Sequence, residues 1–270
     1  MKQRLKDIIE ADKTTSDYNT AAFVEFGLSA DKHYDILVVA PGWTPTKLMQ
    51  GFDVEIICTA KHSYISGYEV KGDGFLIAWI QTSPGACSLI DELSMCAVLE
   101  FDELIFLGAV GSLTKDIGVG ALCTPSFCIS GNLANGYLLE DITEYKPFGK
   151  VFPNDTEYVL NVMELIGEMG YEIKQAPVFC TDTVLCEYAH MDFIKSFDVS
   201  LIEMETSSFY LMADLLEKPS AALLVVSDNS ATGESLVLRT KEQKDKYNES
   251  RFNAIPQILL QIAKNLHMKQ

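Results

Sequence analysis

Short, continuous apolar runs divide this chain, and each ends in a loop of glycine or polar residues. The strongest runs are residues 35–40, 75–80, 103–107 and 221–226. Runs of this length without alternation are typical of strands buried on both faces. Between the strands lie segments whose apolar residues have helical spacing, namely 86–100, 154–170 and 241–267. Alternating strands and helices predict an α/β fold, with a single twisted mixed β-sheet wrapped by α-helices.

The remaining local signals predict how the elements begin and end. Asn154 is expected to cap a helix that ends at Gly170, and Pro256 to interrupt the last helix. The glycines in residues 108–112 are expected to break the strand before them. Residues 118–129 suggest a pair of strands, and the polar stretch 131–153 suggests a mobile loop.

Length and charge limit the architecture and the partners. A chain of 270 residues without repeats or linkers predicts one domain over residues 1–270. The net charge of −17 repels nucleic acids and anionic membranes, so we expect neither as a partner. No apolar run approaches the ~20 residues of a membrane span, and the charged N-terminus lacks the apolar segment of a signal peptide.

Cysteine and histidine positions argue against structural metal and disulfides. The seven cysteines are odd in number and form no C-x-x-C pair, and the four histidines are scattered. This pattern predicts reduced thiols in a cytoplasmic protein and no metal site.

Two acids lie where an apolar run gives way to a helix. Glu203 and Glu205 flank Met204, and alternation along an extended backbone puts both carboxylates on one side. Neighbouring carboxylates can accept hydrogen bonds from a diol such as ribose. In a very acidic chain, solvated loop acids are the simpler interpretation. Other polar or glycine-rich loops also follow strands, however, and active sites of α/β sheets gather at the carboxyl ends of strands.

Four segments in order resemble the nucleoside phosphorylase superfamily, which includes purine nucleoside and uridine phosphorylases and the methylthioadenosine/S-adenosylhomocysteine nucleosidases. They are the Glu-Met-Glu segment at 203–205, Val-Val-Ser-Asp at 225–228, the glycine-bearing loop at 107–112 and the strand entry at 118–122. The resemblance covers about residues 35–265 and implies a nucleoside phosphorylase-like fold.

The resemblance implies roles for several residues. Met204 and Glu205 would bind the ribose, with Glu203 lining the same pocket, and Asp228 after Ser227 would be the acid that assists the leaving base. Cleavage of an N-glycosidic bond builds negative charge on the base, which a nearby carboxylic acid can protonate. Thr183 and Val184 occupy the family's base-stacking segment, with valine in place of its aromatic residue.

The phosphate site departs from the family pattern. The resemblance assigns Gly42, Lys47, Lys61, Ala109 and Gly111 to phosphate, with Lys61 at the position of an arginine lent by a neighbouring subunit. The two lysines replace arginines, and a lysine lacks the bidentate fork of an arginine. Phe106 replaces a third arginine, and Ala109 replaces a hydroxyl-bearing residue. The nucleosidase branch needs a glutamate in the loop at 40–47, and this loop has no acid.

Three functions follow from these observations. The first is a nucleoside phosphorylase in purine or pyrimidine salvage, a glycosyltransferase that gives a free base and ribose 1-phosphate. The second is a hydrolase of the methylthioadenosine/S-adenosylhomocysteine nucleosidase type. The third is a nucleoside-binding protein with little turnover. The resemblance implies no cofactor beyond phosphate as co-substrate, and a homo-oligomer, either a dimer or a hexamer.

Overall fold

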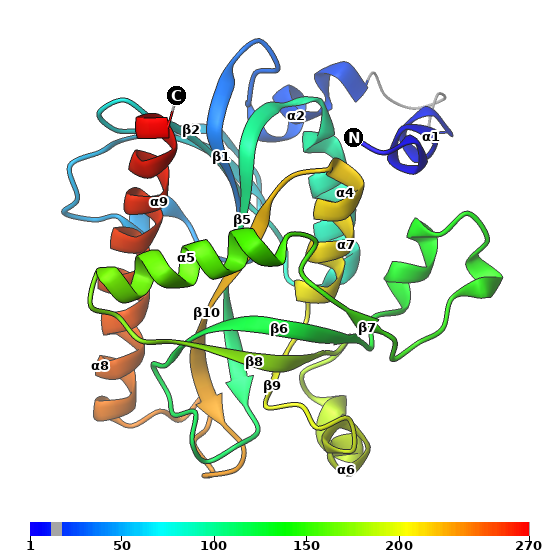
Figure 1. The fold of residues 1–270 in the computed structure, drawn as a ribbon, viewed down its shortest axis with the longest axis vertical. Helices are drawn as coiled ribbons and strands as arrows, with labels where there is room; N and C mark the ends of the chain where they lie inside the picture. The colour runs from blue at the N-terminus through cyan, green and yellow to red at the C-terminus, as the bar shows by residue number, and fades with distance from the viewer. Residues whose placement is uncertain (12–17, 270) are drawn as a thin grey trace.

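The computed structural model describes residues 1–11 and 18–269, and within them ten strands form one mixed sheet (Figure 1). The strands are β1 (His33–Val39), β2 (Glu55–Lys61), β3 (Ser66–Lys71), β4 (Leu76–Gln81), β5 (Glu100–Ser112), β6 (Leu122–Ser130), β7 (Lys150–Val151), β8 (Ile173–Cys180), β9 (Leu201–Glu203) and β10 (Ser220–Asn229). The predicted mixed sheet is confirmed. Strand β3 was missed because its sequence, Ser-Gly-Tyr-Glu-Val-Lys, is neither continuously apolar nor cleanly alternating.

The sheet has an open wing and a closed ring. Strand β10 pairs with both β5 and β6, so β5, β9, β8, β6 and β10 close on one another. From β5 the sheet continues outward through β1, β4, β3 and β2. Strands β1, β4, β5 and β10 run parallel, so their carboxyl ends lie at one edge of the sheet.

Helices cover both faces of this sheet (Figure 1). The α-helices are α1 (Gln3–Ala11), α2 (Tyr18–Phe26), α3 (Pro45–Leu48), α4 (Ala86–Met95), α5 (Thr156–Glu168), α6 (Met191–Lys195), α7 (Thr206–Leu216), α8 (Lys241–Glu249) and α9 (Ile255–Lys269). Short 3-10 helices are η1 (Cys96–Val98), η2 (Leu133–Leu138), η3 (Ile142–Glu144) and η4 (Cys186–His190). None of the helices in the described ranges is long and apolar enough to cross a membrane.

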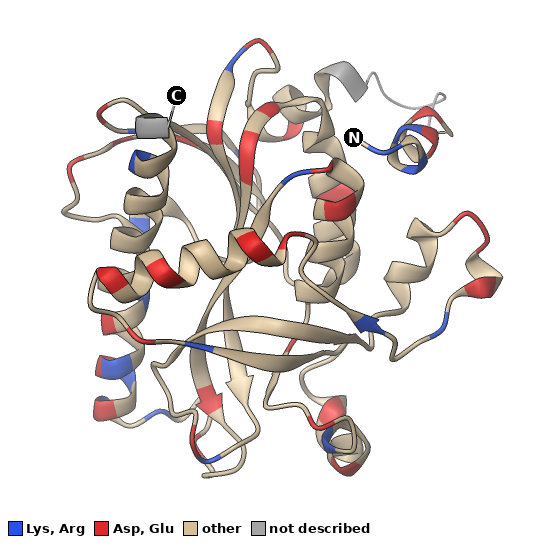
Figure 2. Cartoon of the chain, viewed as in Figure 1, with Lys and Arg blue, Asp and Glu red and all other residues tan. Residues whose placement is uncertain are grey.

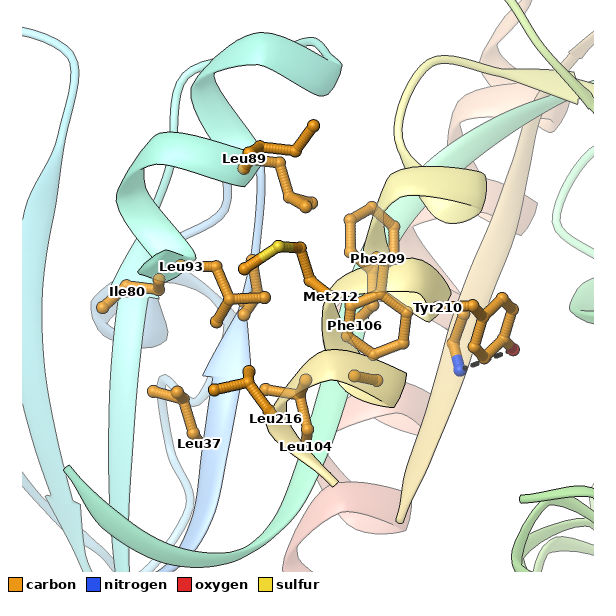
Figure 3. Close-up of a cluster of buried hydrophobic side chains, with 14 of the residues drawn as sticks. Leu37, Ile80, Leu89, Leu93, Leu104, Phe106, Phe209, Tyr210, Met212 and Leu216 are labelled. Carbon is orange, nitrogen blue, oxygen red and sulfur yellow. Dashed lines mark hydrogen bonds between the residues drawn. The ribbon is translucent and has the colours of Figure 1, made fainter. Parts of the chain in front are cut away.

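The core is built from strands whose side chains are buried on both faces. On β1, Leu37 joins the cluster beneath α4 and α7, whereas Ile36 and Val38 join the cluster beneath α5 and α9. Figure 3 shows the first cluster, where Phe106 of β5 lies against Phe209 of α7 with ring centroids 5.4 Å apart. Burial on both faces explains why these strands read as continuous apolar runs.

Aspartate and glutamate residues are spread over helices and loops around the sheet (Figure 2). Helix α5 carries Glu157, Glu164 and Glu168 and no basic residue.

Several local predictions were wrong. Strand β5 continues through Gly108 to Ser112, because the missing side chain at Gly108 leaves room for the ring of Phe106, 2.6 Å from where a Cβ would lie. Residues 118–121 form a turn before the single strand β6. Helix α5 is capped by Asp155, whose carboxylate accepts a hydrogen bond from the Tyr158 N–H.

The segments 131–153 and 241–267 also differ from expectation. Segment 131–153 contains η2, η3 and β7, and the Tyr145 hydroxyl donates a 2.6 Å hydrogen bond to the Asn132 carbonyl. Pro256 lies in the first turn of α9, after a π-helical turn at Ser250–Ala254. Proline has no N–H to donate and its ring crowds the carbonyl four residues earlier, and the wider turn accommodates both effects.

Candidate active site

A cavity of about 310 Å³ opens at the carboxyl ends of the strands. Strands β5, β9 and β10 and the loops after β1, β4 and β8 form its wall. The lining residues are Pro41, Trp43, Pro84, Gly108, Ala109, Gly111, Thr181, Val184, Glu187, Tyr188, Ile202, Glu203, Met204, Glu205, Ser227, Asp228 and Leu236. Most of the residues predicted to bind ribose and base therefore meet in one place.

Glu205 presents a buried carboxyl group to this cavity. One of its oxygens, Oε1, accepts a 2.6 Å hydrogen bond from the Gly85 N–H. Burial raises the pKa of Glu205, and the nearby charge of Glu203 raises it further. Gly85 lies in the loop after β4. Its φ of 106° is in the left-handed region, which favours glycine. Sequence reasoning missed this contact because a backbone amide has no side-chain signature.

Glu203 lines the same cavity, but its carboxylate is used within the protein. Oε2 accepts hydrogen bonds from the N–H groups of Glu205 at 2.7 Å and Thr206 at 2.9 Å. Oε1 accepts from the Thr206 hydroxyl at 2.7 Å and the Cys180 thiol at 2.8 Å. With four donors already bound, Glu203 fixes the turn between β9 and α7 and so orients Glu205.

Asp228 lies on β10 and lines the cavity. The β5–β10 register shifts between Val226 and Asp228, so that Asp228 pairs with Gly111. A side chain at Gly111 would place its Cβ 3.2 Å from Asp228 Oδ2, so the glycine makes room for this carboxyl group. The Ser227 hydroxyl donates a 2.5 Å hydrogen bond to Asp228 Oδ1. Burial raises the pKa of Asp228, while this hydrogen bond and the charge of Arg239 act in the opposite direction. Asp228 is therefore suited to hold a proton for a leaving base.

Two cavity residues from η4 were missed by sequence reasoning. The Glu187 side chain is only 8% exposed, and burial together with the charge of Asp228 raises its pKa to about 7. Tyr188 is more exposed, and its pKa is raised by burial and by the charges of Asp228 and Glu187. Their only sequence signal is a single acid in the run 184–189, which does not show that the acid is buried.

The other predicted base-side residues fall at the rim or behind it. Val184 lines the cavity and is 44% exposed. Thr183 lines an adjacent cavity instead, and its hydroxyl accepts a hydrogen bond from the Cys186 N–H.

The predicted phosphate ligands do not assemble within this chain. Ala109 and Gly111 line the cavity, but Gly42, Lys47 and Lys61 do not. Lys47 is exposed on α3, and Lys61 ends the outermost strand β2. The cavity wall, as far as the structure describes it, contains four carboxyl-bearing residues and no lysine, arginine or histidine.

Phe106, which replaces a family arginine, and the hydroxyl group of Ser112 both serve the fold. Phe106 is 1% exposed and packs in the core against Phe209. The Ser112 hydroxyl donates to the Thr114 carbonyl and accepts from the Thr114 N–H.

A phosphate ion in this cavity would therefore meet carboxyl groups and no lysine, arginine or histidine in the described wall. Arg239, whose charge acts on Asp228, donates its Nε–H to the Ser227 carbonyl at 2.6 Å and does not line the cavity.

Comparison with known proteins identifies the family. The family model described as "Phosphorylase superfamily" matches residues 59–261. This chain belongs to the phosphorylase superfamily. The matched range contains all the strands and loops of the cavity wall except β1 and the loop that follows it.

Within the phosphorylase superfamily, curated relatives are DeoD-type purine nucleoside phosphorylases. The relative from Anoxybacillus flavithermus is 27% identical over 146 residues, covering 54% of this chain and 59% of that protein. The relative from Oceanobacillus iheyensis is 24% identical over 159 residues, covering 58% and 64%. The chain thus spans less than two thirds of the length of the curated relatives it matches.

Solved structures of similar fold are described as nucleosidases or hydrolases. An AMP nucleosidase from Bacteroides thetaiotaomicron has a TM-score of 0.68 at 15% identity, covering 93% of this chain and 96% of that one. A futalosine hydrolase mutant of Helicobacter pylori has a TM-score of 0.64 at 15% identity, covering 86% and 99%. The 5′-methylthioadenosine/S-adenosyl homocysteine nucleosidase of Campylobacter jejuni has a TM-score of 0.65 at 17% identity, with the same coverage. They support the phosphorylase-superfamily fold.

Proposed function

We propose that this protein cleaves the N-glycosidic bond of a nucleoside by hydrolysis, releasing a free base and ribose. The observation that carries the proposal is the chemistry of the cavity wall, which combines a cavity-lining carboxyl at Glu205, an acid at Asp228 and no lysine, arginine or histidine among the described lining residues. Water needs no cationic ligands, whereas a phosphate co-substrate does.

The residues divide the reaction between sugar and base. Glu205 accepts hydrogen bonds from the ribose hydroxyls, and Met204 lies beside it. The bond from C1′ to the base breaks with its electron pair moving to the base, and Asp228 supplies the proton that neutralises it. Water adds to C1′ and loses a proton, which restores the acid through solvent. Positive charge grows on the sugar in the transition state of glycoside cleavage, and the surrounding carboxyl groups stabilise that charge.

Phosphorolysis is the second candidate. It is favoured by the purine nucleoside phosphorylases among the curated relatives and by the glycine-bearing wall at Gly108 and Gly111. It needs a cationic ligand, and the described cavity wall contains no lysine, arginine or histidine. We therefore propose with it a homo-oligomer, in which a neighbouring subunit supplies Lys61.

The deciding experiment identifies the sugar product. Purified protein is incubated with a panel of purine and pyrimidine nucleosides in ¹⁸O-labelled water, with and without inorganic phosphate. Hydrolysis gives ribose that carries ¹⁸O at C1′ at a rate independent of phosphate. Ribose 1-phosphate formed only with phosphate would replace the proposal by phosphorolysis. Binding without product would indicate a nucleoside-binding protein.

Variants connect the product to the cavity. Asp228→Asn keeps the shape of the side chain but has no proton to give, so base release is expected to fall by about 10²–10⁴-fold. Asp192→Asn, on exposed helix α6, makes the same change of charge outside the cavity and is the matched control.

A further inference from the structure

Glu187 is a buried acid without a structural partner. Its side chain is 92% buried, and its carboxyl group makes no hydrogen bond with any residue that the structure describes. Its oxygens are not among the fully buried side-chain atoms without a partner, so the carboxyl group opens into the cavity. No hydrogen bond among the described residues uses this carboxyl group, and the residue lines the cavity.

Asp228 is the charged group that acts on Glu187. Both residues line the first cavity, and the charge of Asp228 raises the pKa of Glu187. In the adjacent cavity, of about 360 Å³, the other titratable lining residues are Asp182, Cys186 and His190. Asp182 is already engaged by the Asn132 side-chain amide at 3.0 Å and the Leu133 N–H at 3.2 Å. Glu187 and Asp228 thus line the same cavity, and the charge of Asp228 acts on Glu187.

Two carboxyl groups in one cavity are less readily ionised together than singly, because their negative charges repel. Such a pair offers a ligand one hydrogen-bond donor and one acceptor. A 6-aminopurine offers the complementary pattern along one edge, with N7 as acceptor and the 6-amino group as donor. A 6-oxopurine offers two acceptors along the same edge, N7 and O6.

We propose that Glu187 is a specificity-determining residue that accepts a hydrogen bond from the 6-amino group while Asp228 donates to N7. The site then selects 6-aminopurine nucleosides, such as adenosine, over 6-oxopurine nucleosides, such as inosine. With a 6-oxopurine, O6 faces the Glu187 carboxylate and the two acceptors repel. The inference rests on the proposed cleavage of nucleosides, but it also applies to binding of the free base.

The test compares adenosine with inosine in the wild-type protein and in Glu187→Gln. The wild-type protein is expected to favour adenosine in kcat/KM by about ten- to a hundredfold, the range of one well-placed recognition pair. A glutamine amide can accept from the amino group or donate to O6, so the preference should collapse to within about threefold. Because Glu187 makes no hydrogen bond in the fold, the substitution removes none, and a matching Tm verifies that the variant is folded. Asp192→Asn should keep the wild-type ratio.

Equilibrium binding of adenine and hypoxanthine separates this inference from the proposed function. If no nucleoside is cleaved, the proposed function fails, and base binding alone decides the role of Glu187. Tighter binding of adenine that is lost in Glu187→Gln supports the inference. Equal binding of the two bases, a preference for hypoxanthine, or an unchanged preference in Glu187→Gln overturns it.

Discussion

At the scale of single residues, the two glutamates at the end of β9 make different interactions. The Glu203 carboxylate is occupied by four donors and holds the turn into α7, whereas the Glu205 carboxyl lines the cavity and accepts from the Gly85 N–H. Glu205 is also buried beside the charge of Glu203, which disfavours its ionised form. We therefore expect Glu203 to stabilise the fold and Glu205 to serve ligand binding at some cost in stability.

This division predicts different results for two substitutions. Glu203→Gln loses charge-assisted hydrogen bonds and turns an amide N–H₂ toward a donor, so the free energy of unfolding should fall by about 1–3 kcal/mol. Glu205→Ala should leave that free energy unchanged or slightly higher, while KM rises about tenfold or more. Urea denaturation and steady-state kinetics measure both quantities. Equal destabilisation by the two variants would contradict the assignment.

Asp228 predicts the direction of the pH dependence. Its pKa is raised, chiefly by burial, so the proton needed by the leaving base persists to higher pH than on an ordinary aspartate. Base release should therefore be highest below this raised pKa and should fall as the pH rises through it. The profile of kcat/KM against pH measures this limb. In Asp228→Asn the remaining activity should no longer show this fall of kcat/KM with rising pH. If the fall persists in the variant, another group is the acid.

At the scale of elements, the contact between β5 and β10 sets the position of the acid. The register shift at Ser227 brings Asp228 opposite Gly111, which lies between Asp228 and Ile202 of β9. A Cβ at Gly111 would lie 3.2 Å from Asp228 Oδ2 and 3.2 Å from Ile202 Cγ2. Such contacts are tighter than normal packing, and the end of a side chain moves more easily than a central strand.

We therefore expect Gly111→Ala to displace the Asp228 carboxyl group. A small misplacement of a catalytic group costs up to about a hundredfold in rate, so kcat should fall by about ten- to a hundredfold. Gly118→Ala is the control, because a Cβ there meets nothing within 4 Å and the backbone is not left-handed. Kinetics of the two variants, with Tm to verify folding, measure the difference. Equal kcat in both would show that the β5 wall does not position the acid.

At the scale of the whole molecule, the sequence predicted the sheet and several residues that line the cavity. Buried strands carry a continuous apolar pattern, and the acids at 203, 205 and 228 lie at strand ends. The strands and these acids could therefore be recognised from short stretches of sequence. The Gly85 amide, the burial of Glu187 and the core position of Phe106 depend on distant segments of chain. Glu203 lines the cavity, but its four donors become visible only when β8, β9 and α7 are packed together.

The position of the lysines gives the last prediction. Lys47 is exposed on α3, and Lys61 ends the outermost strand β2, which three strands separate from β5. Neither contributes to the cavity wall, and exposed charges far from a site are screened by salt. For a hydrolase, Lys47→Ala and Lys61→Ala should each leave kcat/KM within about twofold of the wild-type value. Initial rates of base release, measured with and without phosphate, test this. A phosphate-dependent loss of activity in Lys61→Ala would favour phosphorolysis with a lysine lent across a subunit interface. The same loss in Lys47→Ala would require the loop after β1 to close over the ligand.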